Sequence, residues 1–532
     1  MTNEKDKRRK GQFYTPTLFV DHAHKMISEQ FGEDWKERFV VWDNCCGTKN
    51  LTRDYYFNEL YSSTLENAEL QIGERYNKEG VAFQFDFLND SLDKLPQGLK
   101  DALEQNKPII FFINPPYAKA NGSSSTTGLA STKVNEEMLK EDMGISSTIL
   151  YCQFLYRICK IKEQYNLTNC HIALFCKPTY LSGSNAMNFR KMFLSEFEYD
   201  KAILFNASVF ADCSDRWGIH FVIYHNGETA DKNDFIHTLV ESNNGEIVET
   251  NKKIIYNLDG KSQASEIFNE TKKRKKGVKT FTFSSALKIR SDIEKNVYDD
   301  AIGYINSPCN NQLKQNYVFL HSHSIADTGN KPIFDENFSD VMALFAARKL
   351  IQDNWINDKD EYLAPNTDNE HWNEFVNDSL VYSLFHSASN QSSLRQVEYK
   401  GKLWDIKNEF FFMPKNEVME LANENNLDFT YNDARVSNER YVYTKLQEIE
   451  LSQEAKAVLD KAIELTKMSF KYRELFNDEH PEYQILNWDC GWYQIKGMLK
   501  EFMPNEYKEF NELYKALAEK MRPMVYELGF LK

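Results

Sequence analysis

The sequence has 532 residues, of which 42% are hydrophobic and 27% are charged, so it encodes a globular chain rather than a disordered one. The 79 acidic residues outnumber the 64 basic residues, and the net charge of −15 excludes binding to nucleic acid through bulk positive charge, although it allows a local basic groove. No apolar run reaches the roughly 18–20 residues of a membrane span, and no apolar segment follows the charged N-terminus. The 9 cysteines form no paired Cys-x-x-Cys array, so we expect a reduced, cytoplasmic protein.

The first part of the chain, up to about residue 225, alternates short β-rich runs with helical patterns. This alternation predicts an α/β fold: a Rossmann-like, seven-stranded, mostly parallel sheet with helices on both faces. A helix is expected at 17–30, before the first strand, and another at 149–161, before the fifth. The predicted strands are residues 40–42, 60–65, 81–85, 108–113, 171–176, 202–205 and 219–224.

The remainder of the chain changes character. Residues 226–300 are rich in turn formers and include the basic run Lys272–Lys276, whereas residues 300–415 mix aromatic stretches with polar loops. Small and apolar residues recur at helical spacing in 452–476. We therefore expect three regions: residues 1–230, a mixed region 231–415, and a helical region 416–532.

The strongest chemical signal is Asn114-Pro115-Pro116-Tyr117, directly after the fourth predicted strand. In open α/β sheets, ligands bind beyond the carboxyl ends of the strands. The prolines stiffen the backbone, so that Asn114 and the carbonyl of Pro115 can accept hydrogen bonds from an exocyclic amino group while Tyr117 offers a flat face for stacking. This arrangement suits a planar substrate with an NH2 group; the alternative is a rigid turn that leaves a strand.

Further signals follow the first three predicted strands. Small residues in the turn Asp43–Asn50 would let a ligand approach the backbone at a helix start. Glu66 lies 19 residues after Gly47, at the spacing of an acid that binds ribose hydroxyls. Asp86 and Phe87 combine an acid with an aromatic ring, which can bind and flank adenine. Alone, Glu66 or Asp86 would more often be a surface carboxylate, and the alternative for the Asp43–Asn50 segment is an ordinary turn between a strand and a helix.

One more element precedes the first strand, in the segment Gly11-Gln12-Phe13-Tyr14-Thr15-Pro16. Thr15 or Pro16 is a plausible helix start, so the alternative is a helix-entry turn.

Together these residues resemble an S-adenosylmethionine-dependent DNA adenine-N6 methyltransferase of the gamma arrangement, similar to type IIG and type I modification enzymes. The likeness extends through residues 171–224 and, more weakly, through most of the remaining chain. It implies catalytic roles for Asn114, Pro115, Pro116 and Tyr117. The residues that it implies for S-adenosylmethionine binding are Gly11, Tyr14, Thr15, Asp43, Cys45, Gly47, Glu66, Asp86, Phe87 and Asn114.

In this family the turn after the first strand lies beside the methionine part of the cofactor, and the Asn-Pro-Pro-Tyr segment holds a flipped target adenine. Phe210 or Trp217 would form the far wall of the base pocket. One departure is Lys49, which stands where a second glycine is common, so that its side chain is expected to crowd the cofactor.

The resemblance implies a catalytic region 1–230, a target-recognition region 231–415 and a helical region 416–532. It implies double-stranded DNA as substrate, no metal and no membrane, and it leaves room for a separate restriction endonuclease or specificity partner. The basic clusters Lys5–Lys10 and Lys272–Lys279 are the candidate local sites for phosphate contact, and the alternative for each is a solvated, flexible segment. No assembled nuclease motif is visible, so we expect modification without cleavage.

Two other functions remain open. Protein-glutamine N-methyltransferases also use Asn-Pro-Pro-Tyr, but such enzymes are much shorter and leave the Gly11–Pro16 element unexplained. A non-catalytic DNA-binding protein on a degenerate methyltransferase fold would account for Lys49 but not for an intact Asn114–Tyr117 segment.

Overall fold

The computed structural model describes residues 14–118, 131–210, 213–269, 282–285, 288–290, 298, 300–322, 329–391, 397–399, 402–404, 408–427, 440–480 and 489–532. The chain divides into two units, which we describe separately. The first comprises Met1–Gly260 and Asn354–Asp360, and the second comprises Lys261–Asp353 and Glu361–Lys532. The first unit therefore includes a short segment from the second half of the sequence.

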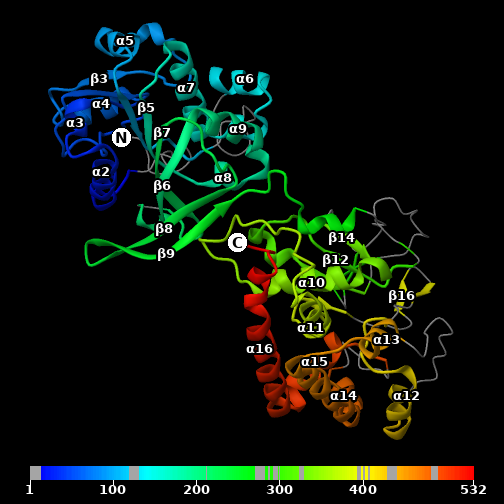
Figure 1. Cartoon of the computed structure of the whole chain (residues 1–532). Helices are drawn as coiled ribbons and strands as arrows, with labels where there is room; N and C mark the ends of the chain where they lie inside the picture. Colours follow the sequence, from blue (N-terminus) through cyan, green and yellow to red (C-terminus); the bar gives the residue numbers. More distant parts are fainter. Residues whose placement is uncertain are drawn as a thin grey trace. The chain divides into compact units, whose positions relative to one another are not determined.

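A nine-stranded sheet forms the centre of the first unit, in the order β3-β2-β1-β4-β5-β7-β6-β8-β9 (Figure 1). Each of the seven predicted strand segments overlaps one of the strands β1 to β7. The sheet is larger than predicted, because β8 and β9 extend it beyond β6. The strands are β1 (Val40–Asp43), β2 (Glu59–Thr64), β3 (Val81–Gln84), β4 (Ile109–Ile113), β5 (Cys170–Cys176), β6 (Phe197–Asn206), β7 (Gly218–Asn226), β8 (Asp234–Asn243) and β9 (Glu246–Tyr256).

The sheet is mostly parallel, as the sequence predicts: β3, β2, β1, β4 and β5 pair in parallel, whereas β7 runs antiparallel to both of its neighbours. The strand order reverses at β1, which lies between β2 and β4. Because parallel crossovers are right-handed, this reversal sends the connections on its two sides to opposite faces and opens a ligand-binding crevice between β1 and β4.

Helices connect most of these strands. The predicted helix before the first strand is α2, and the one before the fifth is α7. The helices of the first unit are α2 (Thr17–Phe31), α3 (Trp35–Arg38), α4 (Asn67–Gly73), α5 (Gln97–Glu104), α6 (Lys133–Lys140), α7 (Leu150–Tyr165), α8 (Thr179–Ser182) and α9 (Met187–Glu196).

Burial along the strands agrees with these positions in the sheet. All five residues of β4, Ile-Ile-Phe-Phe-Ile, are buried, as expected of a central parallel strand that is covered on both faces. The edge strand β3 is largely exposed. The rigid centre therefore lies under the crevice, where β1 and β4 pair in the register Val40↔Ile109 to Trp42↔Phe111.

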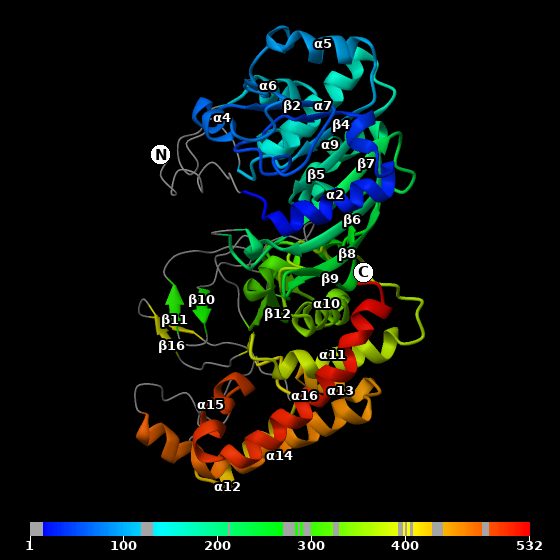
Figure 2. The ribbon, with the colours of Figure 1, turned by 90° about the vertical axis from the view of Figure 1, so that its left-hand side faces the viewer.

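The second unit combines small sheets with a group of helices, in which α16 lies along α14 (Figure 2). One sheet has the order β14-β12-β13-β15, and β10-β11 and β16-β17 form two hairpins. The strands are β10 (Thr282–Ser285), β11 (Lys288–Arg290), β12 (Gly303–Asn306), β13 (Phe319–His321), β14 (Asn330–Ile333), β15 (Ser389–Asn390), β16 (Val397–Tyr399) and β17 (Lys402–Trp404). The helices are α10 (Phe338–Leu350), α11 (Trp372–Phe385), α12 (Lys415–Glu424), α13 (Tyr441–Glu448), α14 (Gln453–Glu479), α15 (Trp492–Phe502) and α16 (Pro504–Glu527).

Candidate functional site

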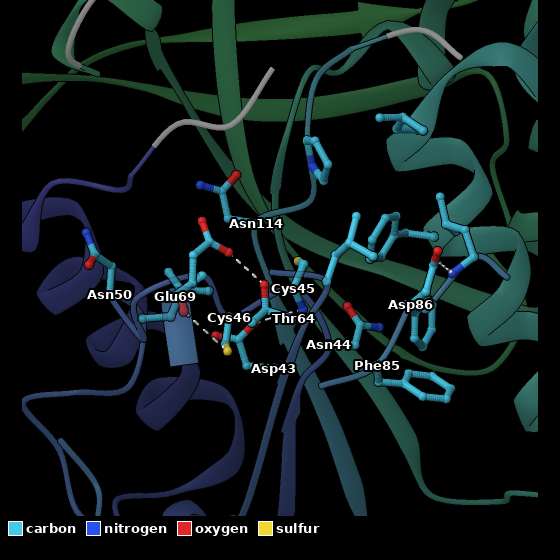
Figure 3. A pocket seen from close by; sticks show the side chains of 18 of the residues that line it. Asp43, Asn44, Cys45, Cys46, Asn50, Thr64, Glu69, Phe85, Asp86 and Asn114 are labelled. Carbon is cyan, nitrogen blue, oxygen red and sulfur yellow. Dashed lines mark hydrogen bonds between the residues drawn. The ribbon is translucent and has the colours of Figure 1, made fainter. Parts of the chain in front are cut away.

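A cavity of about 310 Å³ lies at the carboxyl ends of β1, β2, β3 and β4 (Figure 3). Of the residues selected from the sequence, the cavity is lined by Tyr14, Thr15, Asp43, Cys45, Gly47, Asp86, Phe87, Asn114 and Pro116. Glu66, Pro115 and Tyr117 do not line it, and Gly11 lies outside the described residues. The cavity also includes Asn44 and Asn50 of the predicted turn Asp43–Asn50, and residues outside the predicted site, among them Thr64, Glu69, Phe85 and Phe154.

The backbone after β1 forms the floor of the cavity. The expected helix start is absent here, because the fully described residues 44–58 form turns and bends. Gly47 has a φ of +50°, which a glycine adopts without strain, and the ring of Tyr14 lies 3.5 Å from the position that a Cβ would take. The turn therefore brings exposed backbone and a tyrosine ring together at one wall.

Lys49 belongs to the same turn, with a φ of +64° that is uncommon for a residue with a side chain. Its side chain runs away from the cavity: the aliphatic part packs near Gly73, and Nζ donates a 2.9 Å hydrogen bond to the carbonyl of Tyr76. Lys49 does not line the cavity. The expectation that this lysine crowds a ligand is therefore wrong, because α4 accommodates the side chain.

Asp43 and Asn44 bring uncompensated polar atoms to the cavity. Both residues are buried, and Oδ1 of Asp43 accepts a 3.4 Å hydrogen bond from the backbone N–H of Cys45. Within the described part of the chain, no hydrogen-bond partner reaches Oδ2 of Asp43 or either amide atom of Asn44. Burial raises the pKa of Asp43 to about 8, against the smaller opposite effect of the Cys45 hydrogen bond. Unpaired buried polar atoms are costly, so this corner is suited to a polar ligand with amine or ammonium donors.

The second carboxylate at the cavity is Glu69, from α4, rather than Glu66. Its Oε2 accepts a 2.8 Å hydrogen bond from the hydroxyl of Thr64, and its Oε1 accepts one of 3.4 Å from the hydroxyl of Tyr14. Glu66 is the residue immediately before α4. The helix turn between them carries Glu69 back over the end of β2, where its carboxylate can accept hydrogen bonds from ligand hydroxyls (Figure 3).

The opposite end of the cavity is aromatic. Phe87 stacks on Phe154 of α7, with ring centroids 5.1 Å apart and planes inclined by 18°. Phe85 is a neighbouring wall residue. The carboxylate of Asp86 accepts a 3.0 Å hydrogen bond from the N–H of Leu88 and a 2.8 Å hydrogen bond from the side chain of Asn89. These two bonds hold the carboxylate against the turn that follows β3. This end suits a flat heterocycle.

The Asn114–Tyr117 segment leaves β4 at the rim of the cavity. The Asn114 amide donates a 2.9 Å hydrogen bond to the hydroxyl of Thr15, and its oxygen accepts a 2.7 Å one from the hydroxyl of Tyr117. These contacts fix the orientation of the amide. Burial raises the pKa of Tyr117 well above its usual value, so the phenol remains a donor.

An aromatic pair extends from this segment away from the cavity. The rings of Tyr117 and Trp217 meet edge to face, 6.0 Å apart at 88°. Phe210 is instead buried in the core, where its ring stacks with that of Phe205. Of the two residues considered for the far wall, only Trp217 is in contact with Tyr117, and Phe210 is a core residue.

The thiols beside the cavity are inert. Burial raises the pKa values of Cys45 and Cys46 well above the usual range for cysteine, so both groups stay protonated near neutral pH. Cys45 therefore contributes to the cavity wall as an uncharged side chain.

Features outside the cavity add little to its chemistry. Among the described helices, none combines the length and apolar character that a membrane span requires.

In the described residues, Glu479, His480 and Glu501 of the second unit bring potential metal-ligand atoms within 4.8 Å of one another, but the carboxylates are exposed and nothing else marks a metal site. The basic clusters Lys5–Lys10 and Lys272–Lys279 lie outside the described residues.

No family model and no curated protein matches the sequence. Among solved structures, the chain is similar to a type I restriction-modification methyltransferase subunit from Streptococcus thermophilus, with 16% identity and a TM-score of 0.32 over 45% of this chain and 51% of that chain. It is also similar to DrdV in a complex with DNA, with 17% identity and a TM-score of 0.33 over 45% of this chain and 28% of that chain. A third similar structure is the type I restriction enzyme EcoKI M protein, with 14% identity and a TM-score of 0.29 over 43% of this chain and 48% of that chain. The chain thus spans about half or less of each of these proteins, and at such scores the function has to be argued from the site.

Proposed function

We propose that this chain is an S-adenosylmethionine-dependent DNA methyltransferase that modifies N6 of an adenine flipped out of double-stranded DNA, within a restriction-modification or DNA-modification system. One observation carries the proposal: a cavity with unpaired donors and acceptors at Asp43 and Asn44 lies beside the Asn114–Tyr117 segment, at the crevice between β1 and β4. The unpaired polar atoms of Asp43 and Asn44 suit the cofactor, and the Asn114–Tyr117 segment suits an exocyclic amine.

The residues in the cavity fit S-adenosylmethionine by their chemistry. Asp43 and Asn44 would hold its ammonium and carboxylate groups, since together they offer unpaired acceptors and a donor. Glu69, in place of Glu66, would accept hydrogen bonds from the ribose hydroxyls, and Phe87 with Asp86 would flank the adenine. When bound, S-adenosylmethionine supplies an electrophilic methyl group on its sulfonium.

Asn114 is the residue that we assign to the substrate amine. Its oxygen now accepts the Tyr117 hydroxyl, and the bond from its amide to Thr15 holds that oxygen in a fixed orientation. Acceptance of a hydrogen bond from N6–H by this oxygen and by the Pro115 carbonyl would raise the electron density on the nitrogen. Tyr117 would stack on the base and partly offset the few kcal/mol that base flipping costs. The contribution of this chain is therefore mainly positioning.

DNA recognition is assigned to the region after the sheet. We retain residues 231–415 as the target-recognition region and 416–532 as the helical region, with residues 1–230 carrying the chemistry. The hairpin β8–β9 nevertheless belongs to the central sheet, and the first unit continues to Gly260. A restriction endonuclease or specificity subunit would be a separate partner, and the cytoplasm is the compartment that such a system requires.

The test is transfer of labelled methyl groups from S-adenosylmethionine to double-stranded genomic DNA from a strain that lacks adenine methylation, followed by nucleoside analysis. Asn114→Ala should bind S-adenosylhomocysteine like the parent but should form no N6-methyladenine. Asn58→Ala is the matched control, because this asparagine is exposed and lies outside the cavity. Sequencing of the methylated product would also give the target sequence.

The other outcomes separate the alternatives. Cofactor binding with methylation of a glutamine-containing protein, and none of DNA, would establish the protein-glutamine alternative. Absence of cofactor binding would favour the degenerate scaffold and overturn the proposal.

A further inference from the structure

The segment Asn354–Asp360 belongs to the first unit although the residues on both sides of it belong to the second. It is anchored by an ion pair between Lys253 of β9 and Asp360, in which both side chains are almost fully buried. Trp355 and Ile356 pack against the hydrophobic core of the first unit. The segment is therefore an integral part of the unit that carries the cavity.

Trp355 lies against the backbone that bears Trp217. A Cβ built on Gly218, the first residue of β7, would lie 3.3 Å from Cε3 of Trp355 and 3.0 Å from Cδ1 of Leu204. Side chains on both sides thus enclose the glycine, and the indole of Trp355 rests on the main chain directly after Trp217.

Lys177 covers the other tryptophan of this cluster. It follows β5 directly, and its Nζ lies 3.7 Å from the centroid of the Trp217 ring, well within the range of a cation–π contact. Asp358 is buried, and burial raises its pKa, whereas the positive charges of Lys359 and Lys177 act in the opposite direction. The ion pair that the structure gives Asp358 is with its neighbour Lys359, at 2.5 Å.

The contacts continue to the proposed catalytic amide. Trp217 meets Tyr117 edge to face at 6.0 Å, and the hydroxyl of Tyr117 donates to Asn114 at 2.7 Å. The path from Trp355 through Gly218 and Trp217 to Tyr117 is made of direct contacts or a single peptide link. None of the residues 354–360 lines the cofactor cavity.

We propose that Trp355 is a positioning residue for the substrate side of the site: it packs beside the main chain that follows Trp217, and through Trp217 it fixes Tyr117 beside Asn114. This inference rests on the proposed function, in which Tyr117 stacks on the flipped base. It assigns Trp355 to capture of the base and not to cofactor binding. The recognition of substrate therefore depends on a segment that is continuous in sequence with the second unit.

The experiment uses the full-length protein and a duplex that carries the mapped target sequence, with 2-aminopurine at the target position for the flipping measurement. The variants are Trp355→Ala and the conservative Trp355→Phe, with Asp353→Asn as an exposed control that lies one residue before the segment. For each variant we would measure kcat with the adenine duplex, the 2-aminopurine fluorescence increase, and the Kd for S-adenosylhomocysteine.

Trp355→Ala should lower kcat about tenfold, in keeping with the loss of one aromatic stacking arrangement around the base. The fluorescence increase should fall in parallel, while the Kd for S-adenosylhomocysteine stays within about twofold of the parent value. Trp355→Phe should recover most of kcat, and Asp353→Asn should change neither kcat nor the fluorescence increase.

Parent-like kcat and flipping in Trp355→Ala would overturn the inference. Equal losses of cofactor affinity and kcat in Trp355→Ala would also overturn it, because they indicate general damage to the unit. Failure of the proposed function is distinguishable, since the parent protein itself would then form no N6-methyladenine.

Discussion

Asp43 gives the sharpest test of the cavity, because its carboxyl is buried, has one unpartnered oxygen and has a pKa raised to about 8. Near neutral pH the empty site therefore holds mostly the protonated form. A ligand that brings an ammonium group to this corner favours the carboxylate, since an opposite charge lowers the pKa of an acid. Binding of such a ligand should release a proton, and its affinity should rise with pH.

The magnitude follows from the pKa. A carboxyl with a pKa of about 8 is half ionised at pH 8, and only about one-hundredth of it is ionised at pH 6. A ligand that binds only the ionised form should then lose about fiftyfold in affinity between pH 8 and pH 6, which corresponds to about 2.3 kcal/mol. Asp43→Asn has no titrating group at this position, so its affinity for the same ligand should change little between pH 6 and pH 8.

Isothermal titration with S-adenosylhomocysteine at pH 6, 7 and 8 would measure the effect in the parent protein and in Asp43→Asn. The difference between the two profiles isolates Asp43 from any titration of the ligand. Asp54→Asn is a suitable control, because Asp54 is exposed and does not line the cavity. Equal pH dependence in the parent and in Asp43→Asn would refute the assignment of Asp43 to the cationic end.

Stability provides an independent check on the same residue. The folded-state pKa of about 8 lies above the ordinary value of 3.8, so the folded protein holds the proton more tightly and loses stability as pH rises through this window. Asp43→Asn lacks that loss. Its free energy of unfolding, relative to the parent, should therefore increase by about 2 kcal/mol from pH 6 to pH 8 in urea titrations without ligand.

Two further substitutions test the walls of the cavity. Glu69→Gln should weaken S-adenosylhomocysteine binding by about tenfold or more, because a charged acceptor for hydroxyl groups is lost. The Kd of Glu66→Gln should stay within about twofold of the parent value. Equal effects of the two variants in calorimetry would contradict our choice of Glu69. Lys49→Gly should leave the Kd for that ligand unchanged, since the side chain points toward Tyr76; a clear gain in affinity would show instead that Lys49 crowds the cavity.

Sequence patterns located the strands well because hydrophobic periodicity is a local property. The five buried residues of β4 and the run Val40-Val41-Trp42 in β1 are apolar whatever their neighbours are, so their burial could be predicted. The extension by β8 and β9 was missed because residues 226–260 are rich in turn formers. Such composition indicates a boundary, although a long hairpin joined by a tight turn at Asn244 and Gly245 has the same signature.

The differences between the predicted site and the structure arise from side-chain direction, which spacing does not encode. Glu66 satisfies the spacing of a ribose-binding acid, but it precedes α4, and one helical turn later Glu69 returns to the end of β2. Lys49 stands where a glycine is common and has a positive φ, yet its side chain is directed to α4. The part played by Asn354–Asp360 could not be predicted, because only the tertiary structure brings that segment to the first unit.

The separation of the two polar groups explains how one sheet edge can serve two reactants. Asp43 ends β1 and Asn114 follows β4, and these strands are parallel neighbours with Trp42 opposite Phe111. Adjacent strands lie about 4.8 Å apart, so ligands held by the two ends are brought within a few ångströms without movement of either strand. Both strands are buried and therefore rigid. A rigid pair of strands suits a reaction whose rate depends mainly on how the reactants are positioned. Under the proposed function, a charged acid at the cofactor side and a neutral amide at the substrate side follow from the chemistry, because a cation has to be held and an amine has to remain nucleophilic.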